Sequence, residues 1–357
     1  MSKLKRSVKV LIVDDSALIR ALLQEVLDSH PDISVVGCAC DPYEARDLIK
    51  QLAPDVLTLD IEMPRMNGIA FLKNLMRLRP MPVVMISTLT QEGAPATLEA
   101  LEIGAVDFVP KPQNVEGGAL ERYRDIIVEK VIGAASANVA NDGDRKLVES
   151  FEKIRISAQK TTRGKKLRSD FVCAIGASTG GTEAIKEIVL GLPENSPPIV
   201  IAQHIPAIFS ASFARRINSM AKVRVCEAEH DQKIEKGVVY IAPGSSHLRI
   251  AGSPGAYICK LGQDAPINRH RPSVEALFDS VNAIAGRYSM GILLTGMGAD
   301  GAEALLRMRE NGILTVAQDE HSSVVWGMPG VAVKLNAAEK ILPLSEIHQF
   351  ILEQAFV

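Results

Sequence analysis

The first 135 residues alternate short apolar runs with polar segments in which apolar residues recur at helical spacing. Such runs are typical of buried strands, and such segments are typical of amphipathic helices. We expect strands at 8–13, 33–39, 56–59, 82–87 and 105–109, and helices at 16–29, 43–52, 68–79, 94–103 and 117–135. Strict alternation of the two predicts a parallel sheet with helices on both faces.

The same pattern returns after a polar stretch. Residues 136–168 are rich first in Asn and Asp and then in Lys and Arg, which is typical of a linker. Further strands are expected at 171–175, 198–203 and 289–295, and helices at 182–190 and from Ala302. The predicted fold class is therefore α/β with two domains. These are a flavodoxin-like (βα)5 domain at 1–135 and a doubly wound, mostly parallel sheet at 169–357.

Composition narrows the class of protein. A hydrophobic content of 47% suffices for ordinary cores, and a net charge of −2 argues against broad binding to nucleic acid or anionic membranes. The five cysteines (38, 40, 173, 226 and 259) have no C-x-x-C spacing and are expected to be buried thiols of a reducing compartment. No apolar run reaches membrane-spanning length, and Asp14-Asp15 stand where a signal peptide would continue. We expect a cytoplasmic protein.

Side chains suited to phosphoryl chemistry follow the predicted strands of the first domain. Asp14 and Asp15, Asp60, Ser87 and Lys111 stand at the strands' carboxyl ends, where ligands collect in parallel sheets. Three carboxylates repel one another unless a hard cation such as Mg²⁺ joins them. Asp60 could then accept a phosphoryl group, and Lys111 and Ser87 could bind its oxygens. Alternatively, Asp15 only caps a helix and Lys111 only occupies a loop.

These residues resemble the receiver domain of two-component response regulators. The resemblance covers about residues 7–130 and rests on Val13-Asp-Asp-Ser16, Leu59-Asp-Ile-Glu-Met-Pro64, Asn67-Gly68, Ser87 and Lys111-Pro112. It implies that a histidine kinase phosphorylates Asp60 and that this requires Mg²⁺ bound by Asp14, Asp15 and Asp60. Ser87 and Lys111 are implied to sense the phosphate.

The first strand–helix junction of the second domain carries a candidate nucleophile. Residues 176–180 (GASTG) fit G-x-S-x-G, in which a serine stands on a tight turn between strand and helix. We expect Gly176 to end the strand, and the small neighbours of Ser178 to let a substrate approach. A structural Gly/Ser turn is the plainer alternative. A dinucleotide-binding loop is a weaker one, because Ser178 replaces the second glycine of G-x-G-x-x-G.

A base and an acid for Ser178 follow two later strands. His204 comes directly after strand 198–203, and Asp300 follows strand 289–295. Parallel strands bring these ends to one edge of the sheet. The sequence therefore predicts a relay in which His204 accepts the serine proton and Asp300 orients the imidazole.

Other residues could fill these roles. His247 and His270 lie in turn-rich sequence, so each could serve as the base or line the cleft. Asp300 could merely cap the helix that follows it. Position favours His204 and Asp300. The remaining histidines are interpreted as surface or loop residues: His30, His230, His321 and His348.

The second domain resembles the chemotaxis receptor protein-glutamate methylesterases. The shared motifs are Gly176-Ala-Ser-Thr-Gly-Gly181, Gln203-His-Ile-Pro206, Ala242-Pro-Gly244, His270-Arg-Pro-Ser-Val-Glu275, Leu294-Thr-Gly-Met-Gly-Ala-Asp-Gly301 and Gly327-Met-Pro329. Together with the receiver, the resemblance covers nearly the whole chain. It implies Ser178 as nucleophile, His204 as base and Asp300 as orienting acid, with Thr179 and Met297 helping to hold the oxyanion.

The implied activity is hydrolysis of glutamate methyl esters, and deamidation of glutamines, on methyl-accepting chemotaxis receptors. A chemotaxis histidine kinase is the implied phosphodonor, and sensory adaptation is the implied outcome. We expect Mg²⁺ in the receiver and no cofactor for the ester chemistry. We expect neither nucleic-acid binding nor membrane insertion. The unphosphorylated receiver is expected to cover the Ser178 cleft.

Two interpretations from other classes stay open. In one, the second domain binds a nucleotide and Ser178 is only a turn residue. In the other, the basic residues Lys160, Arg163, Lys165, Lys166 and Arg168 contact DNA. The DNA-binding interpretation is poor, because the sequence has no helix-turn-helix or zinc signature and no aromatic residues among these cations.

Overall fold

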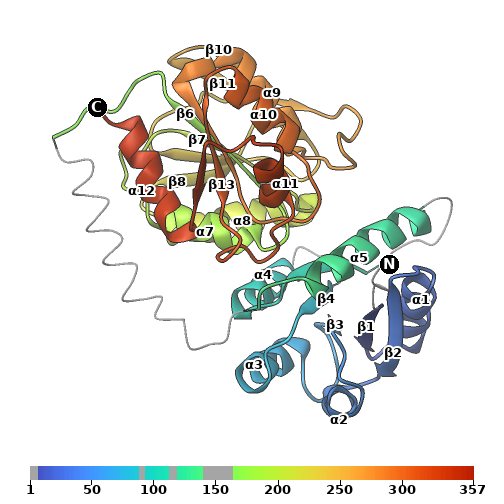
Figure 1. Cartoon of the computed structure of the whole chain (residues 1–357). Helices are drawn as coiled ribbons and strands as arrows, with labels where there is room; N and C mark the ends of the chain where they lie inside the picture. Colours follow the sequence, from blue (N-terminus) through green and yellow to red (C-terminus); the bar gives the residue numbers. More distant parts are fainter. Residues whose placement is uncertain (1–6, 88–92, 112–118, 140–163) are drawn as a thin grey trace. The chain divides into compact units, whose positions relative to one another are not determined.

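Two parallel sheets form the framework of the chain. The computed structural model describes residues 7–87, 93–111, 119–139 and 164–357. By contacts, the chain divides into two units, residues 1–144 and 145–357, each with its own sheet (Figure 1). Most of the expected linker, with Lys160 and Arg163, lies outside the described residues, as does Pro112.

The first unit is a five-stranded parallel sheet in the order β2-β1-β3-β4-β5. Its strands are β1 (Val8–Val13), β2 (Ile33–Ala39), β3 (Val56–Asp60), β4 (Val83–Ser87) and β5 (Asp107–Pro110). The alternating helices are α1 (Ala17–Asp28), α2 (Pro42–Leu52), α3 (Gly68–Leu78), α4 (Ala94–Ile103) and α5 (Ala119–Ala135). This order confirms the predicted flavodoxin-like (βα)5 fold.

Side-chain caps fix where three of these helices begin. Ser16, Asp41 and Asn67 precede α1, α2 and α3, and each accepts a hydrogen bond from a backbone N–H of the first helical turn. Strands β3 and β4 are buried along their whole length, as expected for strands covered by helices on both faces. Because all five strands are parallel, their polar carboxyl ends meet at one edge of the sheet.

The second unit contains a seven-stranded sheet in the order β14-β13-β12-β6-β7-β9-β8, and all its neighbouring strands are parallel. The strands are β6 (Val172–Ala177), β7 (Ile199–Gln203), β8 (Arg224–Glu227), β9 (Val238–Ile241), β12 (Ser289–Leu293), β13 (Leu314–Gln318) and β14 (Lys340–Leu342). A separate antiparallel hairpin consists of β10 (His247–Ser253) and β11 (Ala256–Gly262).

The helices of this unit form two groups. Helices α7 (Gly181–Leu190), α8 (Ala207–Asn218) and α12 (Leu344–Ala355) make one, and α9 (Val274–Ile284), α10 (Ala302–Glu310) and α11 (Met328–Lys334) make the other. Side chains alternate between the faces of a strand. Within β6, Gly176 faces Val274 of α9, whereas Ala177 faces Gly181 of α7. The two groups therefore cover opposite faces, as in the predicted doubly wound fold.

Strand β6 marks the point where the strand order reverses. From β6 the chain continues on one side to β7, β8 and β9, and it then crosses to β12, β13 and β14 on the other side. Open α/β sheets bind ligands beyond the carboxyl ends of the strands at such a switch point. Ser178 directly follows β6 and so stands at this place.

The expectation that Gly176 ends the strand is wrong. Strand β6 runs on through Gly176 to Ala177, and Gly176 pairs with Ala202 on one side and Leu293 on the other. A Cβ atom at Gly176 would lie only 2.2 Å from Cγ1 of Val274. Glycine is needed there because α9 packs closely on the sheet, and the turn begins only at Ser178.

Two smaller expectations also need correction. His348 is not a surface residue: it lies in α12, and only 3% of it is exposed. All five cysteines are free thiols, but only Cys173 and Cys259 are buried: Cys38 and Cys226 are half-buried, and Cys40, which follows the end of β2, is exposed. Among the described helices, none is both long and apolar enough to cross a membrane.

Candidate functional site

Backbone pairing places Ser178 and His204 side by side. Ala177 pairs with Gln203 at the ends of β6 and β7, and Ser178 and His204 are the next residues along each strand. The His204 N–H donates to the carbonyl oxygen of Ala177 at 3.1 Å. On the other side, the Ser178 N–H donates to the carbonyl oxygen of Thr295 at 3.0 Å, just beyond β12. Ser178 is 5% exposed.

Glycines make the close packing around Ser178 possible. A Cβ atom at Gly296 would lie 2.4 Å from the Met328 sulfur and 2.7 Å from the Ser178 Cβ. Gly180 follows Ser178 with a φ of +74°, a left-handed conformation that favours glycine. The Gly181 N–H then donates to the Ser178 carbonyl oxygen at 2.7 Å, which tightens the turn into α7.

Gln203 ties the serine and histidine segments together. Its side-chain Nε2 donates to the carbonyl oxygen of Ser178 at 2.9 Å and to that of His204 at 3.1 Å. The residue is buried. Sequence reasoning missed this role, although an amide at the end of an apolar strand, directly before His204, was a usable signal.

His204 and Asp300 form the central contact of the site. The His204 Nε2 lies 2.8 Å from Oδ2 of Asp300, and their side chains are 6% and 1% exposed. The ring of His270 stacks on that of His204, with ring centroids 3.7 Å apart and an angle of 11° between the planes. His270 thus faces His204 itself.

The Nε2 contact defines which histidine nitrogen is available. Because Nε2 is engaged by Asp300, only Nδ1 can accept a proton. Nδ1 is buried and has no hydrogen-bond partner within the described part of the chain. Nδ1 is therefore the ring nitrogen of His204 that is left to act as a base.

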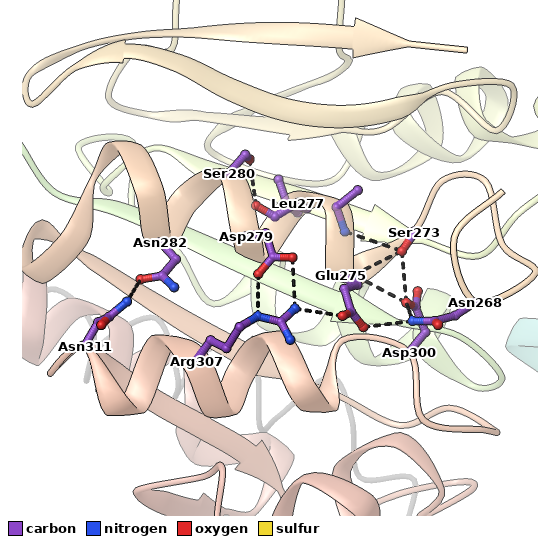
Figure 2. Close-up of polar contacts among 11 residues, drawn as sticks. Asn268, Ser273, Glu275, Leu277, Asp279, Ser280, Asn282, Asp300, Arg307 and Asn311 are labelled. Carbon is purple, nitrogen blue, oxygen red and sulfur yellow. Dashed lines mark hydrogen bonds and ion pairs between the residues drawn. The ribbon is translucent and has the colours of Figure 1, made fainter. Parts of the chain in front are cut away.

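Asp300 is held at the N-terminus of α9 (Figure 2). Oδ2 also accepts from the Val274 N–H at 2.7 Å, and Oδ1 accepts from the Ser273 hydroxyl at 2.9 Å and from Asn268 Nδ2 at 3.0 Å. Burial alone would raise the pKa of Asp300. The hydrogen bond and charge of His204, with Asn268 and the Val274 amide, outweigh burial and hold this pKa well below the ordinary carboxyl range.

The alternative roles can now be compared with the structure. Asp300 does not cap α10 with its side chain, because Gly301 is the residue at that position and the helix has no side-chain cap. His247 is fully buried: its Nε2 lies 3.1 Å from the Ala265 carbonyl oxygen, and its Nδ1 accepts from the Ser273 N–H at 3.2 Å. It therefore supports the loop that carries Asn268.

Thr179 and Met297 flank the serine. Thr179 is 2% exposed, and its carbonyl oxygen accepts from the Thr295 hydroxyl at 3.0 Å. Met297 is partly buried and follows Gly296, the residue packed against Ser178. Both of these sequence-predicted residues lie beside the nucleophile candidate.

The second cluster lies at the carboxyl edge of the receiver sheet. Ligand oxygens of Asp14, Asp15 and Asp60 all lie within 4.8 Å of one another. Lys111 Nζ is 3.0 Å from Oδ2 of Asp14 and 2.8 Å from Oδ2 of Asp60. One lysine cannot balance three carboxylates, and the all-oxygen donor set suits a hard cation such as Mg²⁺.

Burial and neighbouring charge disfavour the ionised form of Asp60 at this edge. Burial is the main cause that raises the pKa of Asp60 to about 6. The hydrogen bond and charge of Lys111 lower this pKa, but only in part, and the negative charge of Asp14 raises it further. Ser87 is buried, its hydroxyl lies 2.9 Å from that of Thr97, and its carbonyl oxygen accepts from the Lys111 N–H at 2.7 Å. The predicted phosphate-site residues therefore share one edge.

Comparisons with known proteins identify both domains. Residues 10–118 match the response regulator receiver domain, and residues 173–351 match the CheB methylesterase domain. The chain is 58% identical to protein-glutamate methylesterase/protein-glutamine glutaminase 2 of Saccharophagus degradans, covering 98% of this chain and 99% of that one. It is 51% identical to protein-glutamate methylesterase/protein-glutamine glutaminase of Hydrogenovibrio crunogenus, covering 97% of this chain and 98% of that one.

A solved structure extends the likeness to the fold. The CheB methylesterase catalytic domain of Thermotoga maritima is 34% identical and superposes with a TM-score of 0.50, covering 52% of this chain and 98% of that one. The family assignment rests on relatives that match almost the whole chain, on both domain matches and on the shared fold of the catalytic domain. The chain belongs to the protein-glutamate methylesterase/protein-glutamine glutaminase family, in which a response regulator receiver domain precedes a CheB methylesterase domain.

Proposed function

We propose that this chain hydrolyses the γ-methyl esters of glutamate side chains in chemotaxis receptors, and deamidates receptor glutamines, under the control of phosphorylation at Asp60. The supporting observation is the shared sheet edge at which Ser178, His204 and Asp300 stand, with His204 bonded to Asp300 through Nε2 and its Nδ1 unused. The names of the relatives supply the substrate class.

In the first half of the reaction, Ser178 Oγ attacks the ester carbonyl carbon and His204 Nδ1 takes the serine proton. Asp300 stabilises the resulting imidazolium through Nε2. The methoxy group leaves as methanol when the imidazolium returns that proton to its oxygen. The product is a γ-glutamyl ester on Ser178.

In the second half, water attacks the acyl group while His204 again serves as base. The proton passes back to Ser178 Oγ as the acyl bond breaks, which frees the glutamate. An amide substrate changes only the leaving group, from methanol to ammonia. The same residues therefore serve the glutaminase activity.

The negative oxygen of the tetrahedral intermediate needs hydrogen-bond donors. We assign this role to the segments that carry Thr179 and Met297, which flank Ser178. Each such donor contributes roughly a hundredfold to a thousandfold in kcat in other serine hydrolases. The left-handed turn at Gly180 and the bare α-carbon of Gly296 let these segments pack directly against their neighbours around Ser178.

Regulation is assigned to the receiver. Asp60 is the proposed acceptor of a phosphoryl group from a chemotaxis histidine kinase, and Lys111 and the Ser87 hydroxyl would bind its oxygens. Asp14, Asp15 and Asp60 would hold Mg²⁺, which neutralises charge during phosphoryl transfer. Phosphorylation shifts the population toward a state in which the esterase site is accessible.

One assay tests the catalytic assignment. Methanol release from methylated receptor is measured for wild type and Ser178→Ala, with and without a small phosphodonor. We expect the variant to lose on the order of a millionfold in kcat, by analogy with serine proteases. Ser219→Ala, which removes an exposed serine hydroxyl bonded only to the Arg216 carbonyl, is the matched control. Normal methanol release by Ser178→Ala would refute the proposal.

A further inference from the structure

A line of polar contacts runs from the α9–α10 surface to Asp300 (Figure 2). Asn268 Nδ2 donates to Asp300 Oδ1 at 3.0 Å and to Glu275 Oε2 at 2.8 Å. Arg307 donates to the other oxygen of Glu275 at 2.7 Å. A surface arginine is thus connected to the catalytic carboxylate through two intervening side chains.

Asn268 meets two separate requirements. Both of its partners are carboxylates, which only accept hydrogen bonds, so its NH₂ group must face them and both of its hydrogens are used. Its backbone has a φ of +51°, a left-handed conformation that asparagine tolerates better than most residues. The side chain is therefore fixed between Asp300 and Glu275.

Arg307 makes this arrangement electrostatically possible. Glu275 would otherwise place an unbalanced negative charge beside Asp300, with one amide between the two carboxylates. Arg307 pairs with Glu275 and also binds both oxygens of Asp279, each at 2.9 Å. Because the planar guanidinium of Arg307 binds Asp279 and Glu275 at the same time, it fixes the position of the Glu275 side chain and balances its charge.

We propose that Asn268 is a positioning residue for Asp300, and that Glu275 and Arg307 position Asn268. The Ser273 hydroxyl and the Val274 N–H hold Asp300 from the α9 side, and Asn268 holds it from the opposing loop. Without this amide, Asp300 loses a restraint on the oxygen that does not contact His204. The inference rests on the proposed function, because Asp300 matters here as the partner of the catalytic histidine.

The first test uses kcat and KM for methanol release by the full chain. Asn268→Ala should lower kcat by about tenfold or more, the usual effect of losing one hydrogen bond to a charged group, with KM changed less than about twofold. Arg307→Met should have a smaller effect in the same direction, and Arg307→Lys should recover part of it. The variant that combines Asn268→Ala with Arg307→Met should have the same kcat as Asn268→Ala alone, because Arg307 acts on Asp300 through the Asn268 amide.

Asn282→Ala is the matched control. It breaks the hydrogen bond from Asn311 Nδ2 to Asn282 Oδ1 (2.9 Å), which joins the same two helices but does not lead to Asp300 (Figure 2). Its kcat should equal that of wild type. A kcat in Asn268→Ala that also equals wild type would overturn the proposal and reduce Asn268 to a loop anchor.

A substrate-free measurement separates this inference from the proposed function. The low-field proton NMR signal of the His204 Nε2–H, identified by its loss in His204→Gln, reports on the bond to Asp300. It should shift or broaden in Asn268→Ala and stay unchanged in Asn282→Ala. If wild type releases no methanol but the signal responds in this way, the proposed substrate is wrong and the positioning role stands. An unmoved signal in Asn268→Ala overturns the positioning role, whatever the substrate.

Discussion

Replacing Asp300 by asparagine would test the relay with almost no change in shape. The carboxylate accepts at both oxygens, from His204 and Val274 at Oδ2 and from Ser273, Asn268 and the Glu275 N–H at Oδ1. An amide offers one acceptor and one donor. If its NH₂ stands at Oδ2, it faces the Val274 N–H, which cannot reverse. If it stands at Oδ1, it faces the NH₂ group of Asn268.

Both orientations therefore leave at least one donor without an acceptor, and both remove the charge that stabilises the protonated imidazole. We expect the free energy of unfolding to fall by about 1–3 kcal/mol, the cost of one unsatisfied buried group. We expect kcat to fall by about a thousandfold to ten-thousandfold, as when the acid of another Ser/His/Asp set is replaced by its amide.

The assay is methanol release at saturating substrate, with urea unfolding of the same samples. Asp231→Asn, an exposed acid paired with Lys260, is the control for loss of one charge. A folded Asp300→Asn variant with kcat within tenfold of wild type would show that the imidazole does not depend on this carboxylate.

Three further changes give distinct expectations. Gly296→Ala should lower kcat by about a hundredfold or more, because the new Cβ would displace Ser178 and a shift of about 1 Å in a reacting group costs that much. Methanol release at the wild-type rate would contradict this packing argument. Asp60→Asn, or chelation of Mg²⁺, should abolish the rise in methanol release caused by a phosphodonor while leaving the basal rate, and a persisting rise would place the acceptor elsewhere. Burial lowers the pKa of His348, whose Nε2 has no hydrogen-bond partner in the described structure. The unfolded chain therefore binds a proton at this histidine more readily than the folded chain, and the urea midpoint of unfolding should fall as the pH drops below about 6.5. His348→Leu should weaken that pH dependence. An unchanged pH dependence would assign it to other groups.

The fold could be predicted well because each level of the sequence pattern agreed with the next. Strands such as β1 and β2 coincide with their predicted bounds, since clear apolar runs end at turn or capping residues. The predicted bounds of a strand were wrong where packing between distant segments determines its end. Gly176 looks like a strand end in sequence, but the approach of Val274 explains it, and Val274 is about a hundred positions away.

Part of the site could also be predicted. Ser178, His204 and Asp300 each follow a strand, and parallel topology was enough to expect them at one edge. Their supports were harder to find. Gln203 and Asn268 act through one or two hydrogen bonds across the fold, and no local spacing encodes such contacts. Ser273 caps α9, and its further bond to Asp300 is another contact that no local spacing encodes.

The reversal of strand order at β6 has a consequence for how activity arises during synthesis. Ser178, the proposed nucleophile, directly follows the first strand of its domain, whereas the proposed acid Asp300 comes after the chain has crossed to the other half of the sheet, 96 residues beyond His204. A nascent chain that has emerged only through β9 holds a serine and an imidazole with no carboxylate to orient them. On the proposed mechanism, full activity therefore requires that the chain be synthesised beyond β12 to Asp300.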